Sequence, residues 1–517
     1  MDTINNSSHR QVMIIVWVFI IINAVFLFSV SLLPFIDLPN HLAEATIFKY
    51  HGTAGNRLSQ FYTPAPWYFP NTFHTVFCSL FPSVEVGNVI FHILCIALLP
   101  VSLFLVIREL NGNLWYSLLG LLFTYNYNVT YGFVGFAISI PTIIILFYVT
   151  LRDFREDRLW LKIMIAFLLV MLFLMHAQNA LFGLLLYGIM ILYRYGRSFK
   201  KLVTRAVFVP LPLILLIFAW WFTRPAVNEE STAGYLLDYY SSEYFSKFFL
   251  RFGIVVFDNF QLRAGLQGVV VAAVIFALIF IPLITLKPWK SKPVRSLISG
   301  NTLYPLILFL VSFGCYLFLP DKLPGQTPLF QRFTTMVLLS FIILVSVWIG
   351  PVRVPWLRYF SVSAAAVYMM LWFEYIYTFN RENSDFTQKL FTEVNNQSRL
   401  AGLIYDNKYR GRLVYIHYPN YFLVWKHGIS ASKIIDYRFG IVRRAALESE
   451  IPFYNELIGE GYRPLPEYAA LEYILVRGEA PVKPDVNLAN FSLLTRAGAW
   501  QLYQHKKLQT AVNGVKH

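Results

Sequence analysis

The stretch "VMIIVWVFIIINAVFLFSVSLLPFIDLPNH", residues 12–41, decides the fold class, because a long, predominantly apolar run leads directly into polar residues. About 20 consecutive apolar residues are enough to cross the hydrocarbon core of a bilayer, and residues 12–33 supply such a run. The run is too long for the apolar core of a signal peptide, and no small-residue cleavage site follows it. We therefore expect a retained transmembrane helix with a polar loop directly after it.

The whole chain shares this apolar character. Of its 517 residues, 57% are hydrophobic, 18% are aromatic and 14% are charged, whereas a soluble domain carries about 25% charged residues. We therefore predict an α-helical polytopic membrane protein with about 11 transmembrane helices, each near the length that a bilayer requires. The predicted spans are 11–34, 86–107, 114–131, 134–151, 160–176, 178–194, 204–222, 266–286, 302–319, 334–350 and 357–379.

The net charge of +15 does not indicate a nucleic-acid partner, because much of the excess lies in short loops between spans. These loops are "LRDFREDR", "YRYGRSFKKLVTR", "KPWKSKPVR" and "PVRVPWLR". All four fall on one side if the N-terminus is cytoplasmic, and the positive-inside rule makes that side the cytoplasm. We expect a multi-pass protein of the bacterial inner membrane, with membrane lipids as partners and an extracytoplasmic C-terminal segment.

Several chemistries have no matching motif in the sequence. Cys78, Cys95 and Cys315 are far apart and lack metal-ligand spacing, so they predict neither a disulfide framework nor a zinc site. There is no phosphate-cradling Gly-rich loop and no HExxH helix. A nucleotide-driven pump and a zincin protease are therefore disfavoured.

The composition changes to that of a soluble domain after Asn380. The stretches "RLVYIHYP" (412–419), "EYILVRG" (472–478) and "AWQLYQH" (499–505) are typical of β-strands, and residues 438–460 look partly helical. We predict a membrane domain over 1–379, including a first outer loop at 35–85, and an extracytoplasmic mixed α/β domain over 380–517.

The first outer loop carries the main candidate for chemistry. If a helix begins after Asp37, then Asp37, His41 and Glu44 share one face of it. Such a group could deprotonate an acceptor hydroxyl, with Asn40 beside it as a substrate contact. It could also hold a divalent cation. Aspartate is equally a favoured N-cap, and Pro39 fits the first turn of a helix, so simple capping remains an alternative.

Other candidates lie at the predicted outer ends of spans. Arg332, with Lys322 earlier in the same loop, suits a phosphate through its planar fork, although arginine also snorkels at interfaces. His176 could contact sugar hydroxyls, and a satisfied interfacial histidine is the alternative. Asn128 and Tyr131 in "TYNYNVTYGF" are further candidates for substrate binding, although tyrosine is ordinary at an interface.

Taken together, this architecture resembles the GT-C superfamily of integral membrane glycosyltransferases, which includes the protein O-mannosyltransferases, the aminoarabinose transferases of lipid A and the oligosaccharyltransferases. The resemblance covers the whole chain as an architecture of many spans with an acidic first outer loop. It implies a sugar donor linked to a lipid phosphate. Asp37 matches the acidic position, but the adjacent second acidic residue of the family is absent, since Leu38 follows. The form "DLPNH" resembles a bacterial branch of the superfamily.

The sequence thus predicts a glycosyltransferase that moves a sugar from a polyprenyl-phosphate donor to a glycan, lipid or protein acceptor. Asp37 is the expected general base, and His41 or Glu44 would orient it or bind a divalent ion. Alternatives are a transporter or flippase of lipid-linked sugars, an O-antigen ligase or polymerase, and a non-enzymatic assembly protein. A transporter would predict inverted repeats and charges near the midplane of the membrane, and the sequence shows neither.

Overall fold

The computed structural model describes residues 2–224, 232–260, 262–291, 300–323, 327–351, 354–431, 441–444, 471–479 and 488–508. The chain forms two compact units. Unit 1 comprises Met1–Ser29 and His92–Glu374, and unit 2 comprises Val30–Phe91 and Tyr375–His517. The sequence pattern alone predicts one boundary, at residue 380, whereas the structure groups the first loop with the C-terminal region.

Most of the chain is helical, and several helices suit a bilayer in length and composition. Among the described residues, six stretches are long and apolar enough to span one. They are Ser8–Phe28 within α1 (Asp2–Phe28), α5 (Val84–Glu109), α8 (Val134–Glu156), α16 (Leu266–Leu286), Phe330–Ile349, which joins η4 (Phe330–Phe333) to α20 (Thr334–Ile349), and α21 (Pro355–Glu382). The bent pair α11 (Phe199–Phe208) and α12 (Leu211–Thr223) makes a seventh if it counts as one span.

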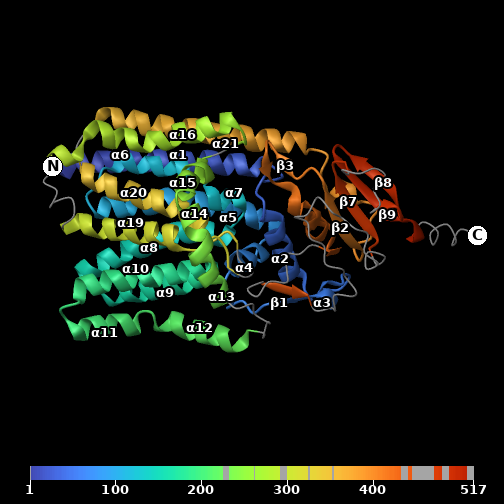
Figure 1. The fold of residues 1–517 in the computed structure, drawn as a ribbon, viewed down its shortest axis with the longest axis horizontal. Coiled ribbons are helices and arrows are strands. Elements are labelled where there is room, and N and C mark those ends of the chain that lie inside the picture. The colour runs from blue at the N-terminus through green and yellow to red at the C-terminus, as the bar shows by residue number, and fades with distance from the viewer. Residues whose placement is uncertain are drawn as a thin grey trace, which may run out of the picture. The chain divides into compact units, whose positions relative to one another are not determined.

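Shorter helices complete unit 1. In it α8, α9 (Leu159–Met175) and α10 (Ala177–Tyr195) lie side by side (Figure 1). Both α9 and α19 (Leu303–Phe318) are apolar, with 17 and 16 residues. The structure confirms a mostly helical protein with helices that could cross a membrane, and the number of 11 spans stays a prediction.

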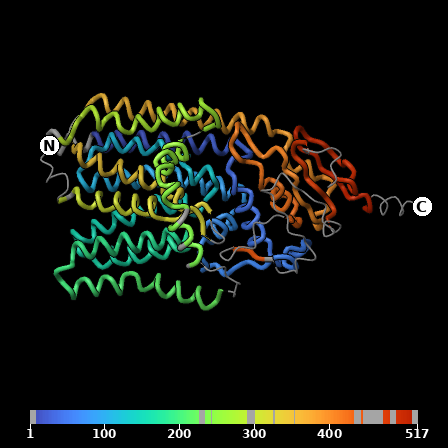
Figure 2. The backbone as a smooth tube through the Cα atoms, in the orientation of Figure 1, coloured from blue at the N-terminus to red at the C-terminus, as the bar shows by residue number. Residues whose placement is uncertain are grey.

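Four short helices follow one another before α16: α13 (Thr232–Asp238), η2 (Tyr239–Glu243), α14 (Tyr244–Phe248) and α15 (Leu250–Phe260). In both views of the chain, α13 and α14 run across the direction of α9 and α10 (Figures 1 and 2). The remaining short helices of unit 1 are α6 (Leu114–Ser117), η1 (Leu118–Phe123), α7 (Tyr127–Tyr131), α17 (Pro288–Ser291) and η3 (Gly300–Thr302).

The predicted span at 114–131 is not one continuous helix but three short ones, α6, η1 and α7. The side chain of Asn126 accepts hydrogen bonds from the backbone N–H groups of Asn128 and Val129, and it donates to the carbonyl of Phe123 at 2.9 Å. These local bonds compete with the helical ladder and start a new helix at residue 127. Gly132 then ends α7 at a φ of 90°, which glycine adopts without strain.

Unit 2 combines the first loop with a β-sheet. The first loop contributes α2 (Leu38–Tyr50), α3 (Leu58–Phe61), β1 (Tyr62–Pro64) and α4 (Phe73–Ser79). The later part contributes η5 (Gln388–Phe391), β2 (Arg399–Ile404), β3 (Lys408–Tyr409), β4 (Arg412–Leu413), η6 (Tyr415–Asn420), α22 (Tyr421–Lys426), β5 (Ile429–Ser430), β6 (Val442–Arg444), β7 (Tyr473–Arg477), β8 (Phe491–Ala497) and β9 (Trp500–His505).

Three sheets organise these strands. The main sheet has five strands in the order β5-β2-β7-β9-β8. Its β2 is parallel to β5 and to β7, whereas β9 is antiparallel to β7 and β8. In a second sheet, β1 of the first loop pairs antiparallel with β6, with Tyr62 opposite Arg444 and Pro64 opposite Val442. The third sheet is the β3–β4 hairpin. The first loop is therefore an integral part of unit 2 and not a free tether.

The strand predictions were partly correct. The strands at 472–478 and 499–505 are confirmed as β7 and β9. The strand predicted over 412–419 is wrong beyond Leu413, because residues 415–420 form the 3-10 helix η6. Pro419 within it has no N–H to give to a strand ladder. Of the predicted partly helical stretch 438–460, only residues 441–444 are described, and 442–444 form β6.

A buried ion pair illustrates how unit 1 accommodates charge. Asp153 of α8 and Arg205 of α11 are both buried, and the Nη1 of Arg205 contacts the Asp153 carboxylate. The Nη2 of Arg205 lies 2.6 Å from Oδ1 of Asp157, and its guanidinium lies 4.7 Å from the ring centre of Tyr195. Nζ of Lys162 also lies 2.7 Å from Oδ1 of Asp157 and 3.9 Å from Oδ1 of Asp153, so two carboxylates and two cations form one cluster.

We expect Arg205→Ala to destabilise unit 1 by about 3–5 kcal/mol, because it removes the buried cation that contacts the buried Asp153 carboxylate. Thermal unfolding of the detergent-solubilised protein measures this. The matched control is Arg155→Ala, whose side chain is 60% exposed and pairs with Glu109 at 2.8 Å, and which should cost about 1 kcal/mol or less. Equal losses in the two variants would contradict the expectation.

Candidate active site

The candidate site in unit 2 begins where α2 starts. Pro39 lies in the first turn of α2, and Asp37 occupies the N-cap position. The side chain of Asp37 makes no capping hydrogen bond, however. The backbone carbonyl of Asp37 accepts instead, from the N–H groups of Asn40 and His41 at 3.1 and 3.3 Å. The capping alternative therefore does not account for the carboxylate of Asp37.

The carboxylate of Asp37 lies beside a histidine from the other part of unit 2. Oδ1 of Asp37 is 3.4 Å from Nε2 of His417, within ion-pair distance. His417 belongs to η6, and the two side chains keep 25% and 16% of their surface exposed. The pair is thus partly buried, which strengthens its attraction, while the carboxylate stays accessible from solvent.

Sequence reasoning missed His417. It lies in "YIHYP", within the stretch 412–419 whose pattern predicts a strand. A single histidine between aromatic residues carries no specific signature. The nearby proline was the available hint that this stretch is not an ordinary strand.

A second carboxylate–imidazole pair lies on α2 itself. Nδ1 of His41 is 3.0 Å from Oε2 of Glu44, whose side chain is 7% exposed. Burial by itself lowers the pKa of His41, but the hydrogen bond and charge of Glu44, together with the charge of Asp37, outweigh it. The pKa of His41 is therefore raised above the ordinary value of 6.5, although the charge of His417 opposes the rise. The predicted convergence of Asp37, His41 and Glu44 occurs, with His417 as a fourth member.

Around these pairs the polar side chains continue inward. The amide oxygen of Asn40 accepts from Nδ2 of Asn420 at 2.7 Å, and Oδ1 of Asn420 accepts from the hydroxyl of Ser430 at 2.5 Å. All three residues are buried. Asn40, a predicted substrate contact, thus fastens α2 to the segment that carries His417. The ring of His74 meets that of His41 at 5.8 Å, edge to face.

A metal was predicted as one use of the cluster. Within the described ranges, no group of three or more His, Cys, Asp or Glu side chains is arranged to hold a metal ion. The reason is visible in the contacts, because Nδ1 of His41 is taken by Glu44 and the Asp37 carboxylate faces His417. The side chains of Asp37, His41, Glu44 and His417 are therefore arranged as two carboxylate–imidazole pairs.

Unit 1 brings several other predicted residues together around Arg332. Arg332 is 8% exposed, and its Nη1 lies 2.9 Å from Nε2 of His176. Because arginine stays protonated, it donates this bond and Nε2 of His176 accepts it. The guanidinium also lies 4.1 Å from the ring centre of Phe133. Arg332 is a buried cation against a neutral imidazole and an aromatic face.

The turn that precedes α8 supplies the other two predicted contacts. Nδ2 of Asn128 donates to the backbone carbonyl of Arg332 at 2.9 Å. Tyr131 stacks on Phe133, with ring centres 4.3 Å apart. The breaks at 114–131 thus place α7 against η4. Arg332 therefore contacts both His176 and Asn128, which the sequence offers as separate candidates.

Close backbone packing helps to place His176, which is the N-cap residue of α10. A Cβ on Gly135 would lie 2.2 Å from the carbonyl oxygen of Met175. Glycine at this position therefore lets α8 approach the α9–α10 turn that carries His176.

Lys322, the other predicted phosphate contact, is exposed. Its ammonium lies 5.8 Å from the ring centre of Tyr235. The described part of the chain contains no contact between Lys322 and Arg332, so the two cations do not form one cluster there.

Comparison of the sequence with protein-family models and with curated proteins gave no match. The functional argument therefore depends on the residues and their geometry.

The raised pKa of His41 predicts a pH-dependent stability. A group whose folded pKa exceeds its unfolded value contributes stability that is full below the unfolded pKa and is lost as pH rises through the folded pKa. We expect the wild-type protein to lose stability as the pH increases from about 6.5 upward. Glu44→Gln removes the principal cause of the rise in pKa and should flatten this dependence.

Thermal unfolding at about pH 6 and about pH 8.5 measures the effect. Glu393→Gln, which changes an exposed glutamate of the same unit, is the control and should retain the wild-type profile. The interpretation fails if Glu44→Gln shows the same pH dependence as the wild type.

Proposed function

We propose that this chain is an integral membrane glycosyltransferase of the GT-C type, which transfers a sugar from a polyprenyl-phosphate donor to an extracytoplasmic acceptor. The observation that supports this most is the Asp37 carboxylate. It stands at a helix start without capping it, remains 25% exposed, and lies 3.4 Å from Nε2 of His417. A carboxylate held in this way suits a general base.

The proposed reaction is a single displacement that inverts the anomeric carbon. Asp37 takes the proton of the acceptor hydroxyl as the hydroxyl oxygen attacks that carbon. The bond between the anomeric carbon and the phosphate oxygen breaks, and the lipid phosphate leaves with the bonding electrons. His417 keeps the Asp37 carboxylate oriented, as a partner imidazole does in other acid–base pairs.

Arg332 is the proposed contact for the departing phosphate. A positioned cation stabilises the charge that builds up on a leaving group, and the planar guanidinium matches phosphate geometry. The first turn of α10 begins at His176, which contacts Arg332. Helix N-termini favour anions through their free N–H groups and dipole. These features support an anion site in unit 1.

Buried polar atoms near Arg332 support a polar ligand. Asn128, Asn179 and Thr334 are fully buried. Within the described residues, Oδ1 of Asn128, both side-chain polar atoms of Asn179 and Oγ1 of Thr334 have no hydrogen-bond partner. Such groups are costly unless something satisfies them. Hydroxyl groups of a sugar are suitable partners, as proposed for His176 and Asn128.

The finer topology belongs to the same proposal. Eleven spans, as predicted from the hydropathy pattern, would leave the N-terminus in the cytoplasm and unit 2 outside, in a bacterial inner membrane. The basic loops support this orientation through the positive-inside rule.

The Asp37→Asn variant distinguishes two roles of Asp37, that of a general base and that of a purely structural residue. Asparagine keeps the size of aspartate but cannot accept the proton, so transfer should fall by roughly 10²–10⁴-fold while the protein folds normally. Glycan transfer to the cell's own acceptor is measured in a deletion background, with membrane levels of each variant. Asp385→Asn, an exposed aspartate of the same unit, is the matched control. Wild-type transfer by a well-expressed Asp37→Asn protein would remove Asp37 from the chemistry.

Arg332→Ala tests the phosphate contact. Loss of a charge-assisted bond to a buried phosphate should weaken donor binding by about 1.5–3 kcal/mol, and Arg332→Lys should not be neutral because it lacks the fork. Mass spectrometry of lipids that co-purify with each variant provides the measurement. We expect polyprenyl phosphates with the wild type and strongly reduced amounts with Arg332→Ala. Equal amounts with both proteins would exclude Arg332 as the anchor.

A further inference from the structure

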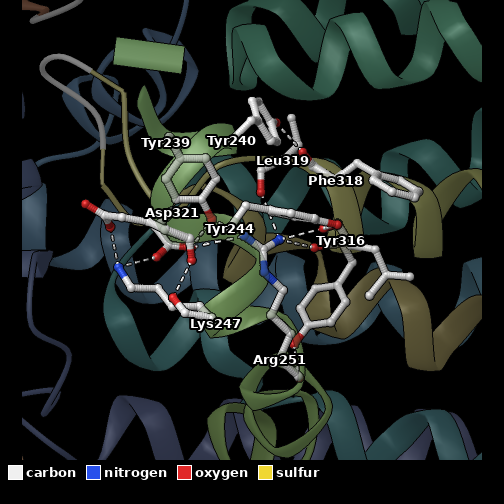
Figure 3. A network of polar contacts seen from close by, with 12 residues as sticks. Tyr239, Tyr240, Tyr244, Lys247, Arg251, Tyr316, Phe318, Leu319 and Asp321 are labelled. Atoms are coloured by element: carbon white, nitrogen blue, oxygen red, sulfur yellow. Dashed lines mark hydrogen bonds and ion pairs between the residues drawn. The ribbon is translucent and has the colours of Figure 1, made fainter. Parts of the chain in front are cut away.

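Arg251 of α15 is fully buried, yet it bears a full charge (Figure 3). A buried charge is tolerated only when it is paired and its donors are satisfied. Nη1 of Arg251 donates to the carbonyl oxygens of Tyr316, Leu317 and Leu319 at 2.9, 2.8 and 2.8 Å. These carbonyls belong to the C-terminal end of α19 and the residue that follows it, where backbone acceptors lack helical partners. Arg251 therefore caps α19.

The other guanidinium nitrogen holds the loop that follows α19. Nη2 of Arg251 lies 2.5 Å from the hydroxyl of Tyr239 and 3.1 Å from Oδ1 of Asp321. The Tyr239 hydroxyl donates to the same Asp321 oxygen at 2.8 Å, and Nζ of Lys247 lies 3.4 Å from Asp321 Oδ2. Figure 3 shows these groups around one guanidinium. Asp321 is thus fixed by three side chains from η2, α14 and α15.

Two connections lead from Arg251 to Arg332. In the first, the backbone N–H of Leu329 donates to the carbonyl of Asp321 at 3.0 Å, and the N–H of Arg332 donates to the carbonyl of Leu329 at 3.3 Å. In the second, the Arg251 guanidinium lies 3.9 Å from the ring centre of Phe330. Phe330 and Arg332 belong to the same short helix, η4.

We propose that Arg251 is a positioning residue for Arg332: through its contacts with Asp321 and Phe330 it holds η4 so that the Arg332 guanidinium meets His176. The part of this inference that concerns a ligand rests on the proposed phosphate site. The segment from Leu319 to Leu329 has little regular structure of its own in its described part, so side chains must fix it. A lysine at 251 keeps the charge but loses the planar fork that reaches the carbonyls, Tyr239 and Asp321 together.

The positioning is tested first without any ligand. Arg332→Cys is introduced after Cys78, Cys95 and Cys315 are replaced by alanine, and its reaction with a small charged thiol reagent is timed. Because position 332 is buried, labelling should be slow. Adding Arg251→Lys should accelerate it by about tenfold or more, since a loosened segment opens more often. Arg263→Lys, the same change at an exposed arginine of unit 1, should leave the rate unchanged. An unchanged rate in Arg251→Lys would overturn the proposal.

The consequence for binding is tested with a polyprenyl monophosphate in detergent, with Arg332 intact. We expect Arg251→Lys to weaken binding roughly 10- to 100-fold, as loss of an aligned charge-assisted bond does, without a comparable loss of thermal stability. Phe330→Leu, which removes the ring under the guanidinium, should act in the same direction and replaces Arg251→Lys if that variant does not fold.

The two tests separate the inference from the proposed function. Faster labelling in Arg251→Lys, combined with a wild-type protein that does not bind the lipid phosphate, upholds the positioning role and overturns the phosphate site. Unchanged labelling, together with lipid binding that Arg332→Ala abolishes and Arg251→Lys retains, upholds the phosphate site and overturns the positioning role.

Discussion

The contact between Asp37 and His417 is the interaction on which the functional interpretation depends. It joins the start of the first loop to the C-terminal region of the chain within one compact unit. The carboxylate faces an imidazole and makes no capping hydrogen bond to the backbone N–H groups of its own helix, which is the geometry that the proposed general base requires. The neighbouring pair of His41 and Glu44 places a second imidazole and carboxylate beside it. The polar residues of this loop are therefore paired with one another and with His417 rather than spread over a solvated surface.

In unit 1, buried cations are compensated by neighbouring groups. Three buried arginines have different partners that offset the energetic cost of burying their charge. Arg205 pairs with two carboxylates, Arg251 donates to backbone carbonyls, and Arg332 donates to a histidine nitrogen. Arg332 thus differs from the other two in having an imidazole within hydrogen-bond distance of its guanidinium.

Much of the helical fold could be predicted from the sequence, because long apolar runs such as 12–33 and 266–286 have few alternatives to a helix. The region 114–131 is equally apolar at its start, but Asn126 and Gly132 impose local caps that hydropathy does not register. In the site, the face shared by Asp37, His41 and Glu44 was predictable from helical spacing alone. His417 was not, because its role arises from a tertiary contact with a residue far away in sequence. Arg332, His176 and Asn128 were each recognisable as unusual polar residues at span ends, whereas their mutual contacts required the structure.

The pairing of β1 with β6 carries a consequence for biosynthesis. The ribosome makes the first loop early, but the strand that completes its sheet emerges only after every helix of unit 1 has been translated. The contact between Asp37 and His417 likewise cannot form until the C-terminal region has been translated. Domains commonly fold in order from the N-terminus during synthesis, and this unit cannot, because its two halves bracket the remainder of the chain. A ribosome that stalls between residues 382 and 400 would leave a protein whose membrane helices are translated but whose acidic loop lacks its partner strand.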